Sequence, residues 1–157
     1  MPEPLRTRLM RWGFNLFPAF RRTGGRITYI ANDWHEIRLK LPLSWRTMNG
    51  VGTLYGGSMY GSVDPIYMVM LINMLGPDYI VWDKAAFIRF KKPGRDTLFA
   101  HFHLSQDEIS SIRTALNTEP SVERLYHIDL VDRQGVVHAF VEKTIYIKKK
   151  EPSGNHR

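Results

Sequence analysis

The sequence predicts an α+β protein in which an antiparallel sheet wraps around one long central helix. Two segments in which apolar and polar residues alternate precede residues 55–75, and further segments of this kind follow them. Residues 55–75 are apolar nearly all round a helix, which is typical of a helix covered on most of its sides. A chain of 157 residues, 43% hydrophobic and 24% charged, is long enough for one well-buried core, so we expect a single domain.

The N-terminal segment, residues 1–25, carries a helical pattern of its own. Its apolar side chains recur at helical spacing, with arginines off the stripe. We expect this helix to pack on the rest of the domain, because Gly13 and Pro18 weaken a free-standing helix. The alternative is a basic amphipathic helix on an anionic membrane surface. The stripe consists of Leu5, Leu9, Trp12, Leu16 and Phe20.

Residues 26–147 contain the expected sheet and the central helix. Pro65 lies inside that helix and lacks the N–H that would bond the Gly61 carbonyl, so we expect a kink directly after Asp64. Gly76-Pro77 ends the helix, and a capping-box pattern at 105–108 opens a short helix later in the chain. The expected strands are 26–30, 36–41, 79–90, 97–104, 122–132 and 136–147. Residues 148–157 read as a charged, disordered tail.

A glycine-rich loop leads into the central helix and ends in Tyr55-Gly56-Gly57. Glycines let backbone N–H groups approach a ligand closely, and the start of a helix directs its free N–H groups and positive dipole end toward that ligand. Two turns further on, Asp64 is surrounded by apolar residues. An unpaired carboxylate there is unfavourable, so Asp64 either has a structural partner or takes part in chemistry. A carbonyl-polarising loop beside a carboxylate suits acyl transfer.

Asn49, Tyr55-Gly56-Gly57 and Asp64 have a familiar spacing. The stretch resembles the central helix of the hotdog-fold acyl-CoA thioesterases, in particular the phenylacetyl-CoA thioesterase branch, where Asn, His-Gly-Gly and Asp fall at these offsets. Residues 86–100 resemble the strand pair that follows, and the character of the whole chain is closest to a hotdog group known mainly as a domain of unknown function. Tyr55 stands where the family has His, and a phenol donates a hydrogen bond but is a poor base near neutral pH.

The resemblance implies a hotdog fold and a site formed between two subunits. Asp64 of one subunit would act as general base toward water or attack the thioester directly. The Gly57 N–H of the other subunit, with Gly56, would polarise the thioester carbonyl. Asn49 would hold the loop or orient a water; the alternative is that it is only a turn residue. Tyr55 would help to place the thioester; the alternative is that it is only a packing residue.

The resemblance also implies a substrate-binding role for the strand that starts near Trp82. Asp83 and Lys84 are neighbours, so in a regular strand they point to opposite faces and one of them faces the site; the alternative is an interfacial salt bridge. A basic cluster near the Pro93-Gly94 turn could bind the phosphates of coenzyme A, or could be a solvated surface turn. The cluster consists of Arg89, Lys91, Lys92 and Arg95.

The most favoured function is therefore acyl-CoA thioester hydrolysis, with coenzyme A as part of the substrate and no other cofactor. One alternative is a protein that binds acyl-CoA or a fatty-acyl ligand without catalysis. A second, suggested only by the net charge of +7, is a basic protein that binds nucleic acid or an anionic membrane. Nucleic acid is disfavoured, because the aromatic-plus-basic strand pattern of RNA-binding modules is missing.

Further expectations concern metals, assembly and compartment. His101 and His103 share a strand face, but no third ligand is placed beside them, so we expect no metal site. A homodimer or a dimer of dimers is expected, because a lone sheet would leave an edge open. No apolar run reaches the length of a spanning helix, and the absence of cysteine fits a reducing compartment, so we expect a cytoplasmic protein.

Overall fold

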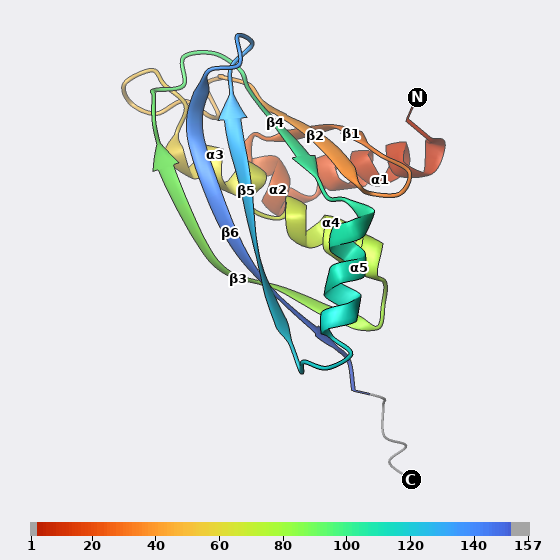
Figure 1. The fold of residues 1–157 in the computed structure, drawn as a ribbon. Coiled ribbons are helices and arrows are strands. Elements are labelled where there is room, and N and C mark those ends of the chain that lie inside the picture. Colours follow the sequence, from red (N-terminus) through yellow and green to blue (C-terminus); the bar gives the residue numbers. More distant parts are fainter. Residues whose placement is uncertain (1–2, 152–157) are drawn as a thin grey trace.

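The computed structural model describes residues 3–151, which form one six-stranded antiparallel sheet and five helices. The strand order is β1-β2-β4-β5-β6-β3, so β1 and β3 are the edges of the sheet. Figure 1 shows the long strands β5, β6 and β3 curving past the two central helices, α3 and α4. The α+β arrangement predicted from the sequence is confirmed. The strands are β1 (Arg26–Ile30), β2 (Glu36–Leu41), β3 (Tyr79–Phe90), β4 (Leu98–His103), β5 (Val122–Val131) and β6 (Val137–Lys149). The helices are α1 (Leu5–Leu16), α2 (Pro18–Thr23), α3 (Gly56–Val63), α4 (Ile66–Leu75) and α5 (Gln106–Ala115).

The long strands β3 and β6 form the most extended pairing in the sheet. They pair antiparallel from Tyr79 opposite Lys149 to Phe90 opposite Ala139. Lys148 and Lys149 are therefore part of β6, so the prediction that the tail begins at residue 148 is wrong; the cross-strand partners Ile80 and Tyr79 extend the strand. The expected disorder of residues 152–157 lies outside the described part of the chain.

The central helix is broken where the sequence predicted a kink. α3 ends as the Asp64 N–H donates to the Tyr60 carbonyl, and α4 begins after Pro65, whose carbonyl accepts from the Val69 N–H. Proline has no N–H to continue the ladder of α3, so the chain starts a new helix one residue later. The break leaves Asp64 at the junction of two helices.

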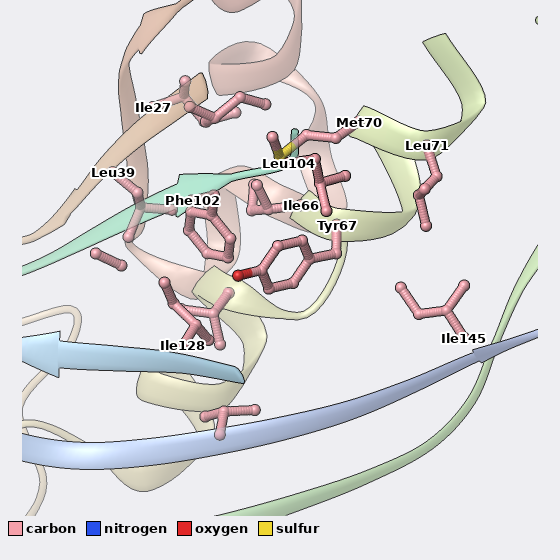
Figure 2. Close-up of a cluster of buried hydrophobic side chains, with 14 of the residues drawn as sticks. Ile27, Leu39, Ile66, Tyr67, Met70, Leu71, Phe102, Leu104, Ile128 and Ile145 are labelled. Atoms are coloured by element: carbon pink, nitrogen blue, oxygen red, sulfur yellow. The ribbon is translucent and has the colours of Figure 1, made fainter. Parts of the chain in front are cut away.

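The core lies between α4 and the concave face of the sheet. Figure 2 shows Tyr67 of α4 among buried aliphatic and aromatic side chains, which come from the strands and from α4 itself. Its ring stacks on Tyr126 and meets Phe102 edge to face, with centroids 4.9 Å and 5.1 Å away, and its hydroxyl donates to the His127 carbonyl at 2.7 Å. Burial raises the pKa of Tyr67 to about 12. These contacts fix α4, and therefore the helix break, against the sheet.

The N-terminal helix α1 packs on the domain as expected, but through the face opposite to its apolar stripe. Thr7, a residue of α1, is buried on the side of the helix that faces the domain. The Asn15 side chain forms two 2.8 Å hydrogen bonds with the Ile27 backbone of β1. The Glu3 carboxylate accepts from the Ile30 N–H at 3.0 Å. Polar anchors to β1 therefore decide the orientation of the helix.

The expectation for the apolar stripe is accordingly wrong for four of its five members. Phe20 is buried, whereas the other four are exposed. Phe17, between α1 and α2, is also exposed, at 61%. Figure 1 shows α1 along β1, at the opposite side of the molecule from the free edge of β3. We call Leu5, Leu9, Trp12 and Leu16 the outer stripe. None of the described helices is both long enough and apolar enough to cross a membrane.

Candidate active site

The carboxylate of Asp64 lies at the break in the central helix and accepts two hydrogen bonds on one oxygen. The Tyr60 hydroxyl, one turn earlier in α3, donates to Oδ1 at 2.7 Å. The Lys143 ammonium, from β6, donates to the same oxygen at 2.5 Å. Among residues 3–151 no donor reaches Oδ2, and the Asp64 side chain is 42% exposed. One oxygen is thus fixed and the other is free to meet a ligand.

Lys143 joins Asp64 to a second carboxylate, that of Asp83 in β3. The side chain of Lys143 is only 1% exposed, and its Nζ lies 3.2 Å from Asp83 Oδ1. That contact is an ion pair without hydrogen-bond alignment, so Asp83 Oδ1 is a buried oxygen with no hydrogen-bond donor among residues 3–151. Two acids therefore share one buried cation, and one of their oxygens, Asp83 Oδ1, could still accept a hydrogen bond.

Burial and the charges of the cluster shift the protonation of its members. Burial raises the pKa of the Asp83 carboxyl, and the charge of Asp64 adds to this shift, whereas the Lys143 ammonium opposes it. Burial alone would lower the pKa of Lys143, but the hydrogen bond and charge of Asp64, with the charge of Asp83, bring it above its ordinary value. Burial and the neighbouring Asp64 raise the pKa of Tyr60. Lys143 therefore stays a cation and Tyr60 stays a hydrogen-bond donor near neutral pH.

Asp64 lines two pockets of different character. The first, of about 490 Å³, is polar and lies between the helix break and β3. The second, an apolar groove of about 630 Å³, runs between α4 and the N-terminal helices. The polar pocket is lined by Tyr60, Asp64, Asp83, Lys84, Ala85, Ala86, Ile88 and Lys143. The apolar groove is lined by Gly13, Phe14, Phe17, Ala19, Phe20, Thr23, Gly61, Asp64, Pro65, Met68 and Val69. A single carboxylate thus separates a polar space from an apolar one.

Asp83 and Lys84 both line the polar pocket, which lies along the edge strand β3 where that strand has a bulge. The pairing of β3 with β6 shifts between Asp83 and Ala85, so the regular alternation stops there. Asp83 and Lys84 nevertheless point to opposite faces of the sheet, as the sequence predicted. Asp83 pairs with Lys143 in the inward row of β6, whereas Lys84 pairs with Glu123 in the outward row of β5. Trp82 is 64% exposed.

The first turn of α3 has both bonded and unbonded backbone donors. Among residues 3–151, no acceptor takes the N–H of Gly57, since the first capping bonds run from Ser58 and Met59 to the Tyr55 carbonyl. The Tyr55 ring lies over Gly57, and a Cβ placed on Gly57 would lie 2.3 Å from Tyr55 Cε1. Gly57 is therefore needed for the close approach of Tyr55. The free N–H has the geometry of an anion-binding helix start.

The loop before α3 forms a separate pocket of about 450 Å³. The Asn49 side chain accepts from the N–H groups of Val51 and Thr53 and donates to Thr53 Oγ1, so it holds the loop. A Cβ on Gly56 would lie 2.9 Å from the Phe90 ring, which explains the second glycine. This pocket is lined by Asn49, Thr53, Leu54, Gly56, Met59, Phe90, Lys91, Lys92 and Pro93.

The structure brings only part of the predicted basic cluster to that pocket. Lys91 and Lys92 line it. Arg89 instead stacks over Phe87, with its guanidinium 5.9 Å from the ring centroid, and Arg95 is exposed on the turn. The predicted site residues therefore fall into two groups on one chain, one around Asp64 and one at the start of α3. Seven residues of helix, about 10 Å, separate Gly57 from Asp64.

Sequence reasoning missed Lys143 and Tyr60. The inward-facing row of β6 consists of buried apolar residues except for Lys143, so a break in the alternation was the available signal. Tyr60 lies four residues before Asp64, the spacing at which two side chains on a helix meet. The inward row of β6 is Ala139, Val141, Lys143, Ile145 and Ile147.

The fold has been seen in several solved structures, all with low sequence identity. A protein of unknown function from Pseudomonas aeruginosa, described as a probable thioesterase, superposes with a TM-score of 0.82 at 21% identity, covering 94% of this chain and 99% of that one. A thioesterase from Haemophilus influenzae gives a TM-score of 0.68 at 14% identity, covering 99% and 97%. The E. coli PaaI protein from the phenylacetic acid degradation operon gives 0.61 at 14% identity, covering 92% and 93%.

These likenesses show that the chain has the hotdog fold, as the resemblance of its central helix implied. No curated protein matches the sequence. A family model described as a domain of unknown function, DUF4442, matches residues 6–147, which is nearly the whole described chain. The chain belongs to this domain-of-unknown-function family, DUF4442, within the hotdog fold.

Proposed function

We propose that the protein is an acyl-CoA thioesterase in which the carboxylate of Asp64 acts on the thioester. The observation that carries this proposal is the position of Asp64, on the wall between a polar pocket and an apolar groove. An acyl thioester has the same two parts, an apolar acyl group and a polar coenzyme A, joined at the bond to be broken. Structures with this fold that are described as a thioesterase or a probable thioesterase add support.

Asp64 is suited to act as a base or a nucleophile because it is held in one orientation. Lys143 and Tyr60 both bind Oδ1, which leaves Oδ2 for a water or for the carbonyl carbon. As a base, Asp64 would take a proton from water while the water oxygen attacks the carbonyl. The C–S bond then breaks and the proton passes to the leaving thiolate. As a nucleophile, Asp64 would attack the carbonyl carbon, and the C–S bond would break to release the thiolate and leave a mixed anhydride. Water would then hydrolyse the anhydride to the free acid and the Asp64 carboxylate, and the proton released would go to the thiolate.

The oxyanion of either route needs a donor that Asp64's own chain does not bring close. Gly57 has a free N–H at a helix start, but about 10 Å of helix separates it from Asp64. We infer that Gly57 of a second subunit completes the site. The free edge of β3, which exposes Trp82, Phe87 and Phe90, is the surface through which a homodimer would form. Two such dimers could join into a tetramer.

The nucleotide end of coenzyme A is anionic, and the pocket before α3 has the matching chemistry. Lys91 and Lys92 line it beside Gly56 and Asn49, where the positive end of α3 also favours phosphate. Arg89 and Arg95 lie on the same strand and turn and would act at longer range.

Thiol release from a panel of acyl-CoAs, from acetyl to dodecanoyl, tests the proposal. Asp64→Asn should lower kcat at least about 100-fold, while calorimetry still detects binding of a non-hydrolysable acyl-CoA analogue. Asp129→Asn, at an exposed acid of β5 outside both pockets, is the matched control and should leave kcat unchanged. If the wild-type protein binds the analogue but releases no thiol from any substrate, it is a ligand-binding protein and the enzyme proposal is wrong.

A further inference from the structure

The outer stripe of α1 presents apolar side chains to solvent on the side opposite to the domain. Leu5, Leu9, Trp12 and Leu16 are 67%, 64%, 60% and 59% exposed. Their spacing of four, three and four residues keeps them within a narrow arc of the helix, and the buried Thr7 lies across the axis from them. An amphipathic helix in a globular protein normally turns such a stripe inward, and an exposed apolar patch of this kind marks an interaction surface.

Positive charge surrounds the outer stripe. Arg6 and Arg8 lie on its two flanks, and both are exposed. Residues 1–31 contain six arginines and one acid, Glu3, and that acid is taken by an ion pair of 2.9 Å with Arg11. A face with this balance fits an anionic partner.

A basic groove continues the same face beyond α1. It has a volume of about 810 Å³. Within the described part of the chain it is lined by five cationic side chains and no acidic one, together with Trp12 and Leu16 of the outer stripe. Trp45 lies in sequence between the lining residues Ser44 and Arg46 and is 79% exposed, with the Arg46 guanidinium 4.9 Å from its ring centroid. The cations are Arg11, Arg21, Arg26, Lys40 and Arg46.

We propose that this face binds the surface of an anionic phospholipid bilayer. α1 would lie in the plane of the interface with its outer stripe among the acyl chains, while the flanking arginines and the groove contact lipid phosphates. Trp12 and Trp45 have the amphipathic rings that favour the headgroup region. A second copy of the chain fits less well, because a symmetric contact would place two arginine-rich faces together. Nucleic acid would use the cations but gives no reason for exposed leucines on a helix.

Vesicle flotation with the full-length protein tests this proposal. Vesicles of phosphatidylcholine with about one-third phosphatidylglycerol should carry at least about fivefold more protein than pure phosphatidylcholine vesicles, and raised salt should weaken the binding. Leu9→Glu and Trp12→Glu should each lower the bound fraction about tenfold or more. Arg8→Glu should lower it on anionic vesicles only.

Matched controls distinguish binding through this face from nonspecific hydrophobic or electrostatic adsorption to the vesicles. Leu125→Glu, on β5 and 52% exposed, matches the stripe variants, and Arg133→Glu, in the β5–β6 turn, matches Arg8→Glu. Both should bind vesicles as the wild type does. Because the stripe is exposed, its variants should keep the wild-type melting temperature. Equal flotation of stripe and control variants, or no flotation of the wild type, overturns the proposal. So does a stripe variant whose only change is a smaller mass in light scattering, since the occupant would then be a second copy.

Discussion

The Nζ atom of Lys143 lies 2.5 Å from Oδ1 of Asp64 and 3.2 Å from Oδ1 of Asp83, so the last strand, the edge strand and the helix break meet at one buried cation. Removing that cation leaves two carboxylates facing each other, one of them with a buried oxygen. The cluster therefore links the stability of the fold to the orientation of the candidate catalytic acid.

We expect Lys143→Met to lower the free energy of unfolding by about 2–3 kcal/mol at pH 7. Breaking a buried ion pair typically costs more, but Asp64 is half-exposed and solvent screens part of its charge. Urea denaturation measures the change. Lys84→Met, which removes a surface pair with Glu123, is the control and should cost well under about 1 kcal/mol. Equal losses in the two variants would contradict a special role for Lys143.

Stability should fall as the pH rises from about 10 to about 12, partly because of Tyr67. Its pKa is raised from 10.0 to about 12 by burial, so in this range the unfolded state has already lost the proton that the folded state keeps. Proton release then favours unfolding, by up to about 2–3 kcal/mol for this group. Tyr67→Phe should make the decline shallower, although losing the hydrogen bond to His127 costs about 1 kcal/mol at pH 7.

The measurement is chemical denaturation at a series of alkaline pH values. Tyr29→Phe, at a half-exposed tyrosine under Arg38, is the control and should keep the wild-type slope. A Tyr67→Phe protein whose stability declines as steeply as that of the wild type would show that the buried phenol does not govern the alkaline transition.

A mixing experiment tests whether Asp64 and Gly57 act across subunits. Gly57→Ala should be nearly inactive, because the new Cβ displaces the Tyr55 ring from the helix start, while Gly50→Ala, with open space around its Cβ, should be active. If the site is shared, unfolding and refolding Asp64→Asn and Gly57→Ala chains together should restore about a quarter of the wild-type activity, since each mixed dimer has one intact site. No recovery from a mixture that light scattering shows to be dimeric would place both groups in one subunit.

The free edge of β3 should be the dimer contact. Phe87→Glu, at a side chain 52% exposed on this edge strand, should halve the mass found by light scattering and lower kcat/KM about tenfold or more. Val136→Glu, at the β5–β6 turn, should change neither quantity. A dimer that survives Phe87→Glu with full activity would require a different interface.

The apolar groove should set acyl-chain preference. Val69→Trp fills the groove, so kcat/KM should fall about tenfold or more for dodecanoyl-CoA and stay within about twofold for acetyl-CoA. Ile72→Trp, on an exposed position of the same helix outside the groove, should leave both values unchanged. An equal loss for both substrates would mean that the acyl group lies elsewhere.

Local chemistry made much of this molecule predictable. Pro65 removes a backbone donor wherever it stands in a helix, so the break beside Asp64 could be located from the sequence. The order of strands and helix likewise led to the α+β fold. The contact with Lys143 could not be found in this way, because 79 residues separate it from Asp64 and only the folded sheet brings them together. The bulge at Lys84 depends on how β3 pairs with β6, which no single strand encodes.

The orientation of α1 shows a second limit. Its stripe has the pattern of a buried face, and burial of an apolar stripe is the usual outcome for such a helix. Two polar side chains, Asn15 and Glu3, instead bind the β1 backbone and turn the other face to the domain. Periodicity measures which residues share a face, but the partner of that face is decided by such specific anchors.

The break at Pro65 places the Asp64 carboxylate where the polar pocket and the apolar groove adjoin. Cleavage of a thioester bound there would release the thiol on the polar side and leave a carboxylate product in the apolar groove, close to the negative charge of Asp64. Mutual repulsion would then expel the product along the groove, past Phe17, which lines the groove and is 61% exposed. The geometry that positions the acid for attack would in this way also empty the site for the next turnover.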